Sequence, residues 1–184
     1  GPAIANEDSP YLAGRLLVAS ENVLDPIFKH TVIHLLQHNA NGAVGLIINR
    51  VISEENLNHL LKGFTLIPSE DERPVSLNYG GPVSTGRVFI LHSPDFKTAN
   101  TFRAPGGLAM TSDQTILDAL ARGKGPIRMK LMIGYSGWGP GQLEKEIARR
   151  DWLIAPADEG VVFDDPGNDI DLWNAARDRA GLTL

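Results

Sequence analysis

The sequence predicts one domain that combines short β-strands with helices. Apolar runs of strand length recur along the chain, and between them lie segments with apolar side chains at helical spacing. No repeat, low-complexity stretch or linker divides the chain. We therefore expect a single domain over residues 11–184, preceded by a loose lead-in over residues 1–10 whose Gly1-Pro2 resembles a protease scar.

The composition is that of a soluble globular protein and excludes several classes of function. With 17 basic and 22 acidic residues the formal charge is −5, so phosphate-driven binding of nucleic acid is not expected. The absence of cysteine removes disulfides, thiolate metal sites and cysteine nucleophiles, and it suits a reducing cytoplasm. The apolar runs are too short to span a membrane. We expect a cytoplasmic protein without a cofactor.

The first third of the chain predicts a strand followed by a β-hairpin. Arg15–Ala19 has the length and apolar character of a buried strand, and Asp25-Pro26 favours a turn after it. The run from His30 to His38 is rich in β-branched residues and predicts the next strand. Residues 39–42 form the hairpin connection, since Asn-Gly accepts positive φ, and residues 43–48 return as a more buried strand.

Three histidines at four-residue spacing, His30, His34 and His38, raise the question of a metal site. On a helix they would share one face within reach of one ion. On the strand that this stretch favours, four residues span about 13 Å, so the three imidazoles cannot share a metal. We expect no metal site, and we expect the histidines to lie on one strand face and to be partly exposed.

The middle of the chain predicts a helix and two strands. Ser53 resembles an N-cap, with acidic residues in the following turn and a leucine stripe that ends at Gly63, and residues 66–74 form an acidic loop. Val75–Tyr79 alternates as a half-buried strand, and Arg87–His92 is the next strand. The segment between them carries Gly80-Gly81-Pro82.

The later elements follow the same signals. Thr111 with Gln114 forms a capping box for a helix that stops at Gly123. Arg128 and Lys130 lie on one face of an alternating strand and predict a small basic patch. Further elements are strands over residues 152–155 and 161–163 and a last helix over residues 170–180, docked by Trp173 and ended by Gly181.

The stretch over residues 131–147 is the most unusual part of the chain. It opens as an apolar strand, passes through a turn with four glycines and Trp138, and leaves as an amphipathic helix. Ser136 within Gly134-Tyr135-Ser136 resembles the nucleophile elbow of hydrolases, but Trp138 stands where that motif requires a small residue. A phosphate-binding loop is disfavoured because neither glycine fingerprint is present and Glu144 and Glu146 occupy the start of the helix.

Taken together, these motifs resemble the YqgE/AlgH family of small bacterial proteins. The matching pieces run in family order from residue 11 to the last helix. They are residues 11–19, Asp25-Pro26 with Phe28, residues 31–38, 42–50 and 79–83, Leu91-His92, residues 134–143, Trp152-Leu153, residues 156–158, Phe163-Asp164 and Trp173.

The resemblance implies an α+β fold whose mixed β-sheet bends into a flattened pseudo-barrel flanked by helices. It implies no enzyme, because the family is largely uncharacterised and its best-known association is a regulatory one, with alginate production. Two residues depart from the family pattern. Val51 stands where proline commonly follows Asn-Arg, which loosens the turn, and Ser136 stands where alanine is common, which weakens the case for a nucleophile.

We expect a non-catalytic binding or regulatory domain that acts through a protein or small-molecule partner. Its odd residues sit at strand ends and should converge on one surface: Asn49, Arg50, Gly80, Gly81, His92, Tyr135 and Trp138. One alternative is a hydrolase with Ser136 as nucleophile and His92 as base. Another is a transcriptional regulator that contacts DNA directly, which the acidic charge and the lack of a helix-turn-helix pattern disfavour. A purely structural role for the 134–141 corner is also open, and the sequence leaves the oligomeric state undetermined.

Overall fold

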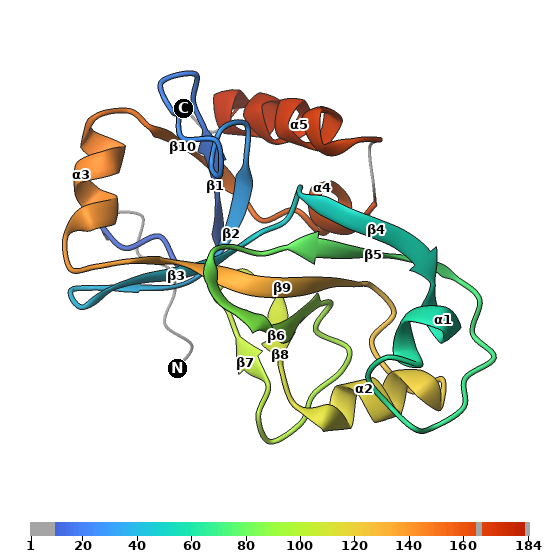
Figure 1. The fold of residues 1–184 in the computed structure, drawn as a ribbon. Helices are drawn as coiled ribbons and strands as arrows, with labels where there is room; N and C mark the ends of the chain where they lie inside the picture. The colour runs from blue at the N-terminus through green and yellow to red at the C-terminus, as the bar shows by residue number, and fades with distance from the viewer. Residues whose placement is uncertain (1–9, 165–166, 183–184) are drawn as a thin grey trace.

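In the computed structural model, which describes residues 10–164 and 167–182, the chain forms an α+β structure with a curled mixed sheet and helices around it (Figure 1). The strands are β1 (Arg15–Ala19), β2 (Val32–Asn39), β3 (Gly42–Ile47), β4 (Val51–Asn56), β5 (Pro74–Tyr79), β6 (Val83–His92), β7 (Phe102–Arg103), β8 (Ala109–Thr111), β9 (Met129–Trp138) and β10 (Trp152–Pro156). The helices are α1 (Leu57–Leu61), α2 (Gln114–Ala121), α3 (Gln142–Ala148), α4 (Glu159–Phe163) and α5 (Asp169–Leu182). This confirms the α+β class and the bent, barrel-like sheet.

The long strand β9 joins the two parts of the sheet. Within the described residues the strand order is β10-β1-β2-β3-β9-β6-β8-β7, with β5 parallel to β9 and β4 paired to β5. The end of β9 pairs with β3, where Ser136 lies opposite Gly45, and its beginning pairs with β6, where Met129 lies opposite His92. The predicted corner is therefore mostly strand, because its backbone is taken up by pairing as far as Trp138, and the turn is confined to residues 139–141.

Three apolar clusters hold the helices against this sheet. In the first, Trp173 and Ala176 of α5 pack with sheet residues such as Leu16 and Met132. The second lies around Trp138 and Trp152, beneath α3, and the third joins α1 and α2 to the beginning of β9. Figure 1 shows α5, α3 and the α1–α2 pair at three different sides of the sheet.

Most predicted strands and the last helix are confirmed, but the helix predicted from Ser53 is wrong over its first residues. Ser53 and the two glutamates after it belong to β4 and pair antiparallel with β5, and the helix begins only at Leu57. The hydrogen bonds available from β5 outweigh the local capping preference, which is worth about 1 kcal/mol.

Three smaller predictions are also corrected. Residues 161–163 form part of helix α4, which Asp158 caps through its carboxylate. Thr111 lies in β8 and hydrogen-bonds to His92 instead of capping α2. The predicted basic patch does not form, because the Lys130 ammonium is buried and donates to the carbonyl oxygen of Ile48.

Three further findings concern the ends of the chain and its helices. Gly181 lies inside α5 and does not end it. The predicted lead-in falls, except for Pro10, outside the described residues. None of the helices within residues 10–164 and 167–182 combines the length and apolar character that crossing a membrane requires.

Candidate functional site

His92 lies buried at the end of β6, where both ring nitrogens are used. The Ser93 carbonyl oxygen can only accept, so Nδ1 carries the proton and donates to it at 2.7 Å. Nε2 then accepts from the Thr111 hydroxyl at 2.8 Å. Burial lowers the pKa of His92, which the hydrogen bond to Ser93 and the nearby Asp95 only partly offset. The imidazole is therefore a neutral bridge between neighbouring segments.

Ser136 is buried on β9, far from His92. Its hydroxyl donates to the Gly80 carbonyl oxygen at 3.1 Å. Because His92 lies opposite Met129, the two residues are separated by the length of β9 between positions 129 and 136, about 23 Å. The Ser136–His92 hydrolase pair is therefore wrong, since no proton can pass directly between side chains that far apart.

Gly80 and Gly81 lie where the end of β5 crosses the backbone of β9. A Cβ atom on Gly80 would meet the Gly134 carbonyl oxygen at 2.3 Å, and one on Gly81 would meet the carbonyl group of Tyr135 at 2.2 Å. Tyr135 turns its ring inward and packs edge-to-face on Phe89, with centroids 5.8 Å apart. Because Gly80 and Gly81 have no side chain, the backbone after β5 can lie directly against that of β9, which closes the sheet.

Asn49 and Arg50 tie three segments together. The buried Asn49 amide accepts from the Val32 N–H at 2.7 Å and donates to the carbonyl oxygens of His30 and Asp169 at 2.9 and 3.0 Å. The Arg50 guanidinium donates to the carbonyl oxygens of Lys29, Ile27 and Pro26 at 2.6, 3.2 and 3.4 Å. Arg50 thus holds the loop before β2, and Asn49 is inaccessible to a ligand.

Trp138 lines a cavity of about 480 Å³ at the far end of β9. Its indole N–H and that of Trp152 donate to the same Glu146 oxygen at 3.1 and 3.0 Å. Phe28 packs edge-on against Trp152, with centroids 6.3 Å apart. Trp138 therefore lies beside a cavity at which polar groups converge.

Five of the seven predicted site residues are buried: Asn49, Gly80, Gly81, His92 and Trp138. The segments of Arg50 and Gly80 adjoin, because the Tyr79 N–H donates to the Arg50 carbonyl oxygen at 2.8 Å, whereas His92 lies opposite the beginning of β9 and Trp138 at its end. Most of them lie at or just after strand ends, but Tyr135 lies within β9. In a bent sheet, however, strand ends point in different directions, and pairing register decides which of them meet.

The three histidines lie in different surroundings. His34 is fully buried in β2 with neither ring nitrogen hydrogen-bonded, and burial lowers its pKa to about 4. His38 is also buried, accepting from the Leu12 N–H at 3.0 Å through Nδ1 and contacting the Glu144 carboxylate through Nε2. His30 precedes β2 and packs its ring on Trp173. The expected partial exposure of His34 and His38 is wrong: residues before β1 and in α3 cover His38, and His34 has no exposed surface. Within residues 10–164 and 167–182, no three potential metal ligands gather.

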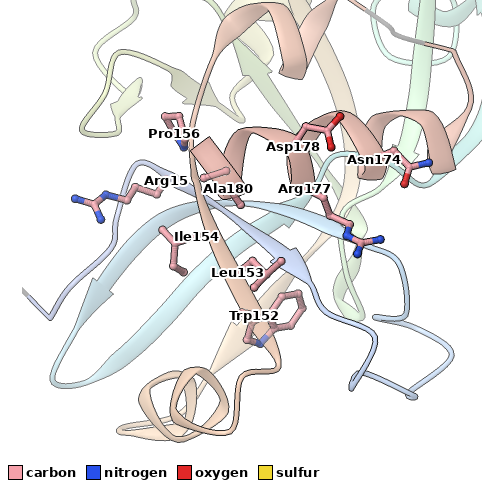
Figure 2. Close-up of a pocket in the computed structure, with 11 residues that line it drawn as sticks. Arg15, Trp152, Leu153, Ile154, Pro156, Asn174, Arg177, Asp178 and Ala180 are labelled. Atoms are coloured by element: carbon pink, nitrogen blue, oxygen red, sulfur yellow. The ribbon is translucent and has the colours of Figure 1, made fainter. Parts of the chain in front are cut away.

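A groove with a volume of about 1100 Å³ lies between β10 and α5 (Figure 2). Its apolar floor comes from β10 and from the end of α5, including Ala155 and Ala180. Leu153 is 37% exposed and lies in this groove. Figure 2 shows Leu153 on β10, with Arg177 and Asn174 reaching out from the neighbouring helix.

Arginines mark the two ends of this groove. Arg15 lies opposite Pro156 in the β1–β10 pair, at one end. Arg177 stacks over Trp173, 4.4 Å from the ring centroid, and its guanidinium lies 3.7 Å from the exposed Glu21 carboxylate. Trp173 in turn donates to the Ala19 carbonyl oxygen, opposite Trp152, which places Arg177 at the other end. Asp178 is the acidic residue of the lining.

The groove was not predicted from the sequence, although one signal was present. Trp173 and Arg177 are four residues apart, so they share a face on any helix, and a tryptophan under an arginine is a recurrent stacking pair. Arg15 and Leu153 carried no such signal, because their pattern is that of ordinary strand residues.

Comparison with known proteins identifies relatives from a single family. The AlgH-like family matches residues 16–184. A UPF0301 protein of Methylococcus capsulatus is 43% identical over 172 residues, covering 94% of this chain and 93% of that protein. A UPF0301 protein of Cereibacter sphaeroides is 41% identical over 159 residues, covering 85% and 86%.

Two solved structures share the fold. The solution structure of the AlgH protein from Pseudomonas aeruginosa superposes with a TM-score of 0.75 at 39% identity, covering 96% of this chain and 93% of that one. The crystal structure of a Corynebacterium diphtheriae protein gives a TM-score of 0.68 at 22% identity, covering 92% and 87%, and bears on the fold alone.

Proposed function

The chain belongs to the YqgE/AlgH family, and we propose that it is a non-catalytic binding domain that holds an extended segment of a partner protein in the groove between β10 and α5. One observation carries this proposal: Leu153, an exposed leucine, lies in a groove of about 1100 Å³ between an outer strand of the sheet and a helix. Exposed apolar surface in a groove with a polar rim is typical of sites that bind another chain.

The charges of the groove favour an acidic partner segment. Arg15 and Arg177 lie at opposite ends of β10, and the four steps from Trp152 to Pro156 span about 13 Å. An extended segment with acidic side chains four residues apart, and an apolar side chain between them, would reach both guanidinium groups and cover Leu153. Arg177 is already held over Trp173, so little side-chain freedom is lost when an acidic side chain of the partner takes the place of the exposed Glu21 beside it.

The surroundings of Ser136 and His92 support a role without catalysis. Each of these groups is buried and hydrogen-bonded to its own fold. Regulation through a protein partner agrees with the acidic charge of −5, which opposes direct binding to DNA. We place this activity in the cytoplasm, since a sequence without cysteine depends on no disulfide.

A peptide titration tests the proposal. The probe is an eight-residue peptide with two glutamates four positions apart and a leucine between them, followed by amide shifts in the protein's NMR spectrum. We expect shifts at Leu153, Asn174 and Arg177, and about tenfold weaker binding for Leu153→Asp and for Arg177→Glu. Leu66→Asp and Arg122→Glu are matched controls, because both residues are exposed far along the chain from the groove.

The proposal fails if the peptide shifts residues elsewhere, or if the control variants weaken binding as much as the groove variants. A peptide with lysines in place of the glutamates should bind much more weakly. Equal binding of the two peptides would show that Arg15 and Arg177 do not contribute to binding.

A further inference from the structure

An aromatic cavity lies where the loop before β2, the end of β9, helix α3 and the start of β10 meet. Its volume of about 480 Å³ is in the range of small-molecule sites, and its aromatic side chains are Phe28, Trp138 and Trp152. The Trp152 ring stands at 80° to that of Phe28 and at 79° to that of Trp138, with centroids 6.3 and 6.2 Å apart. Three rings in nearly perpendicular planes around one cavity resemble the aromatic cages that hold organic cations.

The charged side chains of the aromatic cavity leave a surplus of negative charge. The lining includes three carboxylates, those of Asp25, Glu146 and Asp151, and one guanidinium, that of Arg149. Arg149 pairs with Asp151, since its Nη2 lies 2.6 Å from a carboxylate oxygen of that residue. The charges of this pair cancel at a distance, so the surplus comes from Asp25 and Glu146. A cation in the cavity is therefore favoured over an anion.

Neutral donors hold the two surplus carboxylates. Glu146 accepts from both indole N–H groups and, at 3.0 Å, from the Gln142 amide, and Asp25 accepts from the Ile27 N–H at 2.8 Å. Neutral donors fix a carboxylate in place but leave its charge intact. Three of the roughly four acceptor positions of Glu146 are used in this way. The cavity thus offers negative charge at Glu146 but few acceptors there for the N–H groups of a ligand.

This combination distinguishes between kinds of cation. A primary ammonium has three N–H donors, and each donor that leaves water without finding an acceptor costs free energy. A quaternary ammonium has no N–H group, and its methyl groups make apolar contact with aromatic rings that also attract its charge. Leu24 lines the same cavity although 75% of it is exposed, so it stands at the mouth, where it can cover the rest of a ligand.

We propose that the aromatic cavity binds a small molecule that carries a quaternary ammonium group. The rings of Phe28, Trp138 and Trp152 surround the methylated nitrogen, the charges of Asp25 and Glu146 attract it, and Leu24 contacts the body of the ligand. The β10–α5 groove is a different site, although Trp152 borders both. This activity goes beyond the binding of a partner segment and does not depend on it.

Three small probes test the proposal. Choline carries the quaternary ammonium, its neutral analogue has a tert-butyl group in place of the trimethylammonium group, and ethanolamine keeps the charge but has N–H groups in place of the methyl groups. The NMR signals of the Trp138 and Trp152 indole N–H groups report on the cavity, and that of Trp173, which lies outside its lining, is an internal control. We expect choline to shift the first two signals only, and the other two probes to bind at least about tenfold more weakly.

Two variants separate the ring from the charge. Phe28→Leu keeps an apolar side chain but removes a ring, so it should weaken choline binding about fivefold and leave the neutral analogue unaffected. Phe96→Leu is the matched control, because Phe96 is also half-buried but lies outside the cavity. Asp25→Asn removes a charge but keeps an acceptor for the Ile27 N–H, and should weaken choline binding about threefold. Asp71→Asn, in a turn with the same hydrogen bond, is its control.

Three outcomes would overturn the proposal. Equal binding of choline and its neutral analogue would show that the cavity selects for apolar surface and not for charge. Equal binding of ethanolamine would show that a methylated nitrogen is not required. Unshifted Trp138 and Trp152 signals at about 10 mM choline would show that the cavity does not bind this cation. Neither Phe28 nor Asp25 lines the β10–α5 groove, so this proposal and the groove proposal fail separately.

Discussion

Trp138 and Trp152 donate their indole N–H groups to the same carboxylate oxygen of Glu146, at 3.1 and 3.0 Å. The two rings meet edge-to-face, with centroids 6.2 Å apart, and one comes from the end of β9 while the other begins β10. A single carboxylate on α3 therefore fixes the helix to two strands.

Replacing Glu146 should destabilise the protein. Glu146→Ala leaves two largely buried indole donors without an acceptor, so we expect a loss of about 2–4 kcal/mol in the free energy of unfolding. Glu146→Gln keeps an acceptor oxygen and should lose less. Urea denaturation checks both, with the exposed Lys145→Ala on the same helix as control. A loss no larger than that of the control would mean that the shared acceptor contributes little.

Gly81 should tolerate no side chain. Its φ is +150° and a Cβ atom would lie 2.2 Å from the Tyr135 carbonyl, so Gly81→Ala must displace β9 and should cost more than about 3 kcal/mol. Gly86→Ala is the matched control, because a Cβ atom there meets nothing within 4 Å. Thermal and urea unfolding of the two variants should differ strongly. Similar stabilities would show that the β5–β9 crossing is loosely packed.

His34 should make stability fall in mild acid. Its pKa is lowered to about 4 in the folded protein from 6.5, so the unfolded chain binds more protons between these values. The free energy of unfolding is therefore unaffected by His34 above pH 6.5 and falls as the pH drops towards 4, by about 3 kcal/mol in all. His34→Leu should abolish this part of the pH dependence and should cost little at pH 7.5, because it removes two unbonded buried nitrogens. Urea unfolding at pH 7.5, 6 and 5 compares the two proteins, and parallel profiles would contradict the prediction.

Asn49 should matter for stability, unlike a ligand-binding residue. Asn49→Ala removes three hydrogen bonds that join the segment before β2 to the start of α5, and should cost about 2–4 kcal/mol. Asn49→Asp keeps the acceptor for the Val32 N–H but loses both donors, so it should not restore stability. Hydrogen exchange of the Val32 amide reports the first bond directly. Unchanged protection in Asn49→Ala would show that this bond is dispensable.

Local pattern was a good guide wherever an element is stabilised by its own residues. Arg15–Ala19 is a strand over the predicted residues, since an uninterrupted apolar run of that length is buried on both faces. The last helix and the docking of Trp173 were likewise predicted from spacing alone, and Trp173 buries its ring and donates to Ala19.

Prediction failed where a distant segment decides the local structure. Ser53 has the sequence environment of a helix cap, yet β5 offers it a ladder, and residues 51–56 pair there instead. Lys130 looks like a solvent-exposed basic residue of an edge strand, but its strand runs through the middle of the sheet. In both cases the deciding hydrogen bonds come from residues far along the chain.

The sequence by itself determined the family, the α+β class, the order of most elements and the special character of the 131–147 stretch, because these depend on residue type and local periodicity. Only the tertiary structure decided which strand ends meet. It separated Ser136 from His92 and moved Asn49, Gly80 and Gly81 into the joints of the fold. It also brought Arg15, Leu153 and Arg177 together around one groove. The physical reason is that register and sheet curvature arise from pairing between distant segments, and a one-dimensional pattern does not contain that pairing.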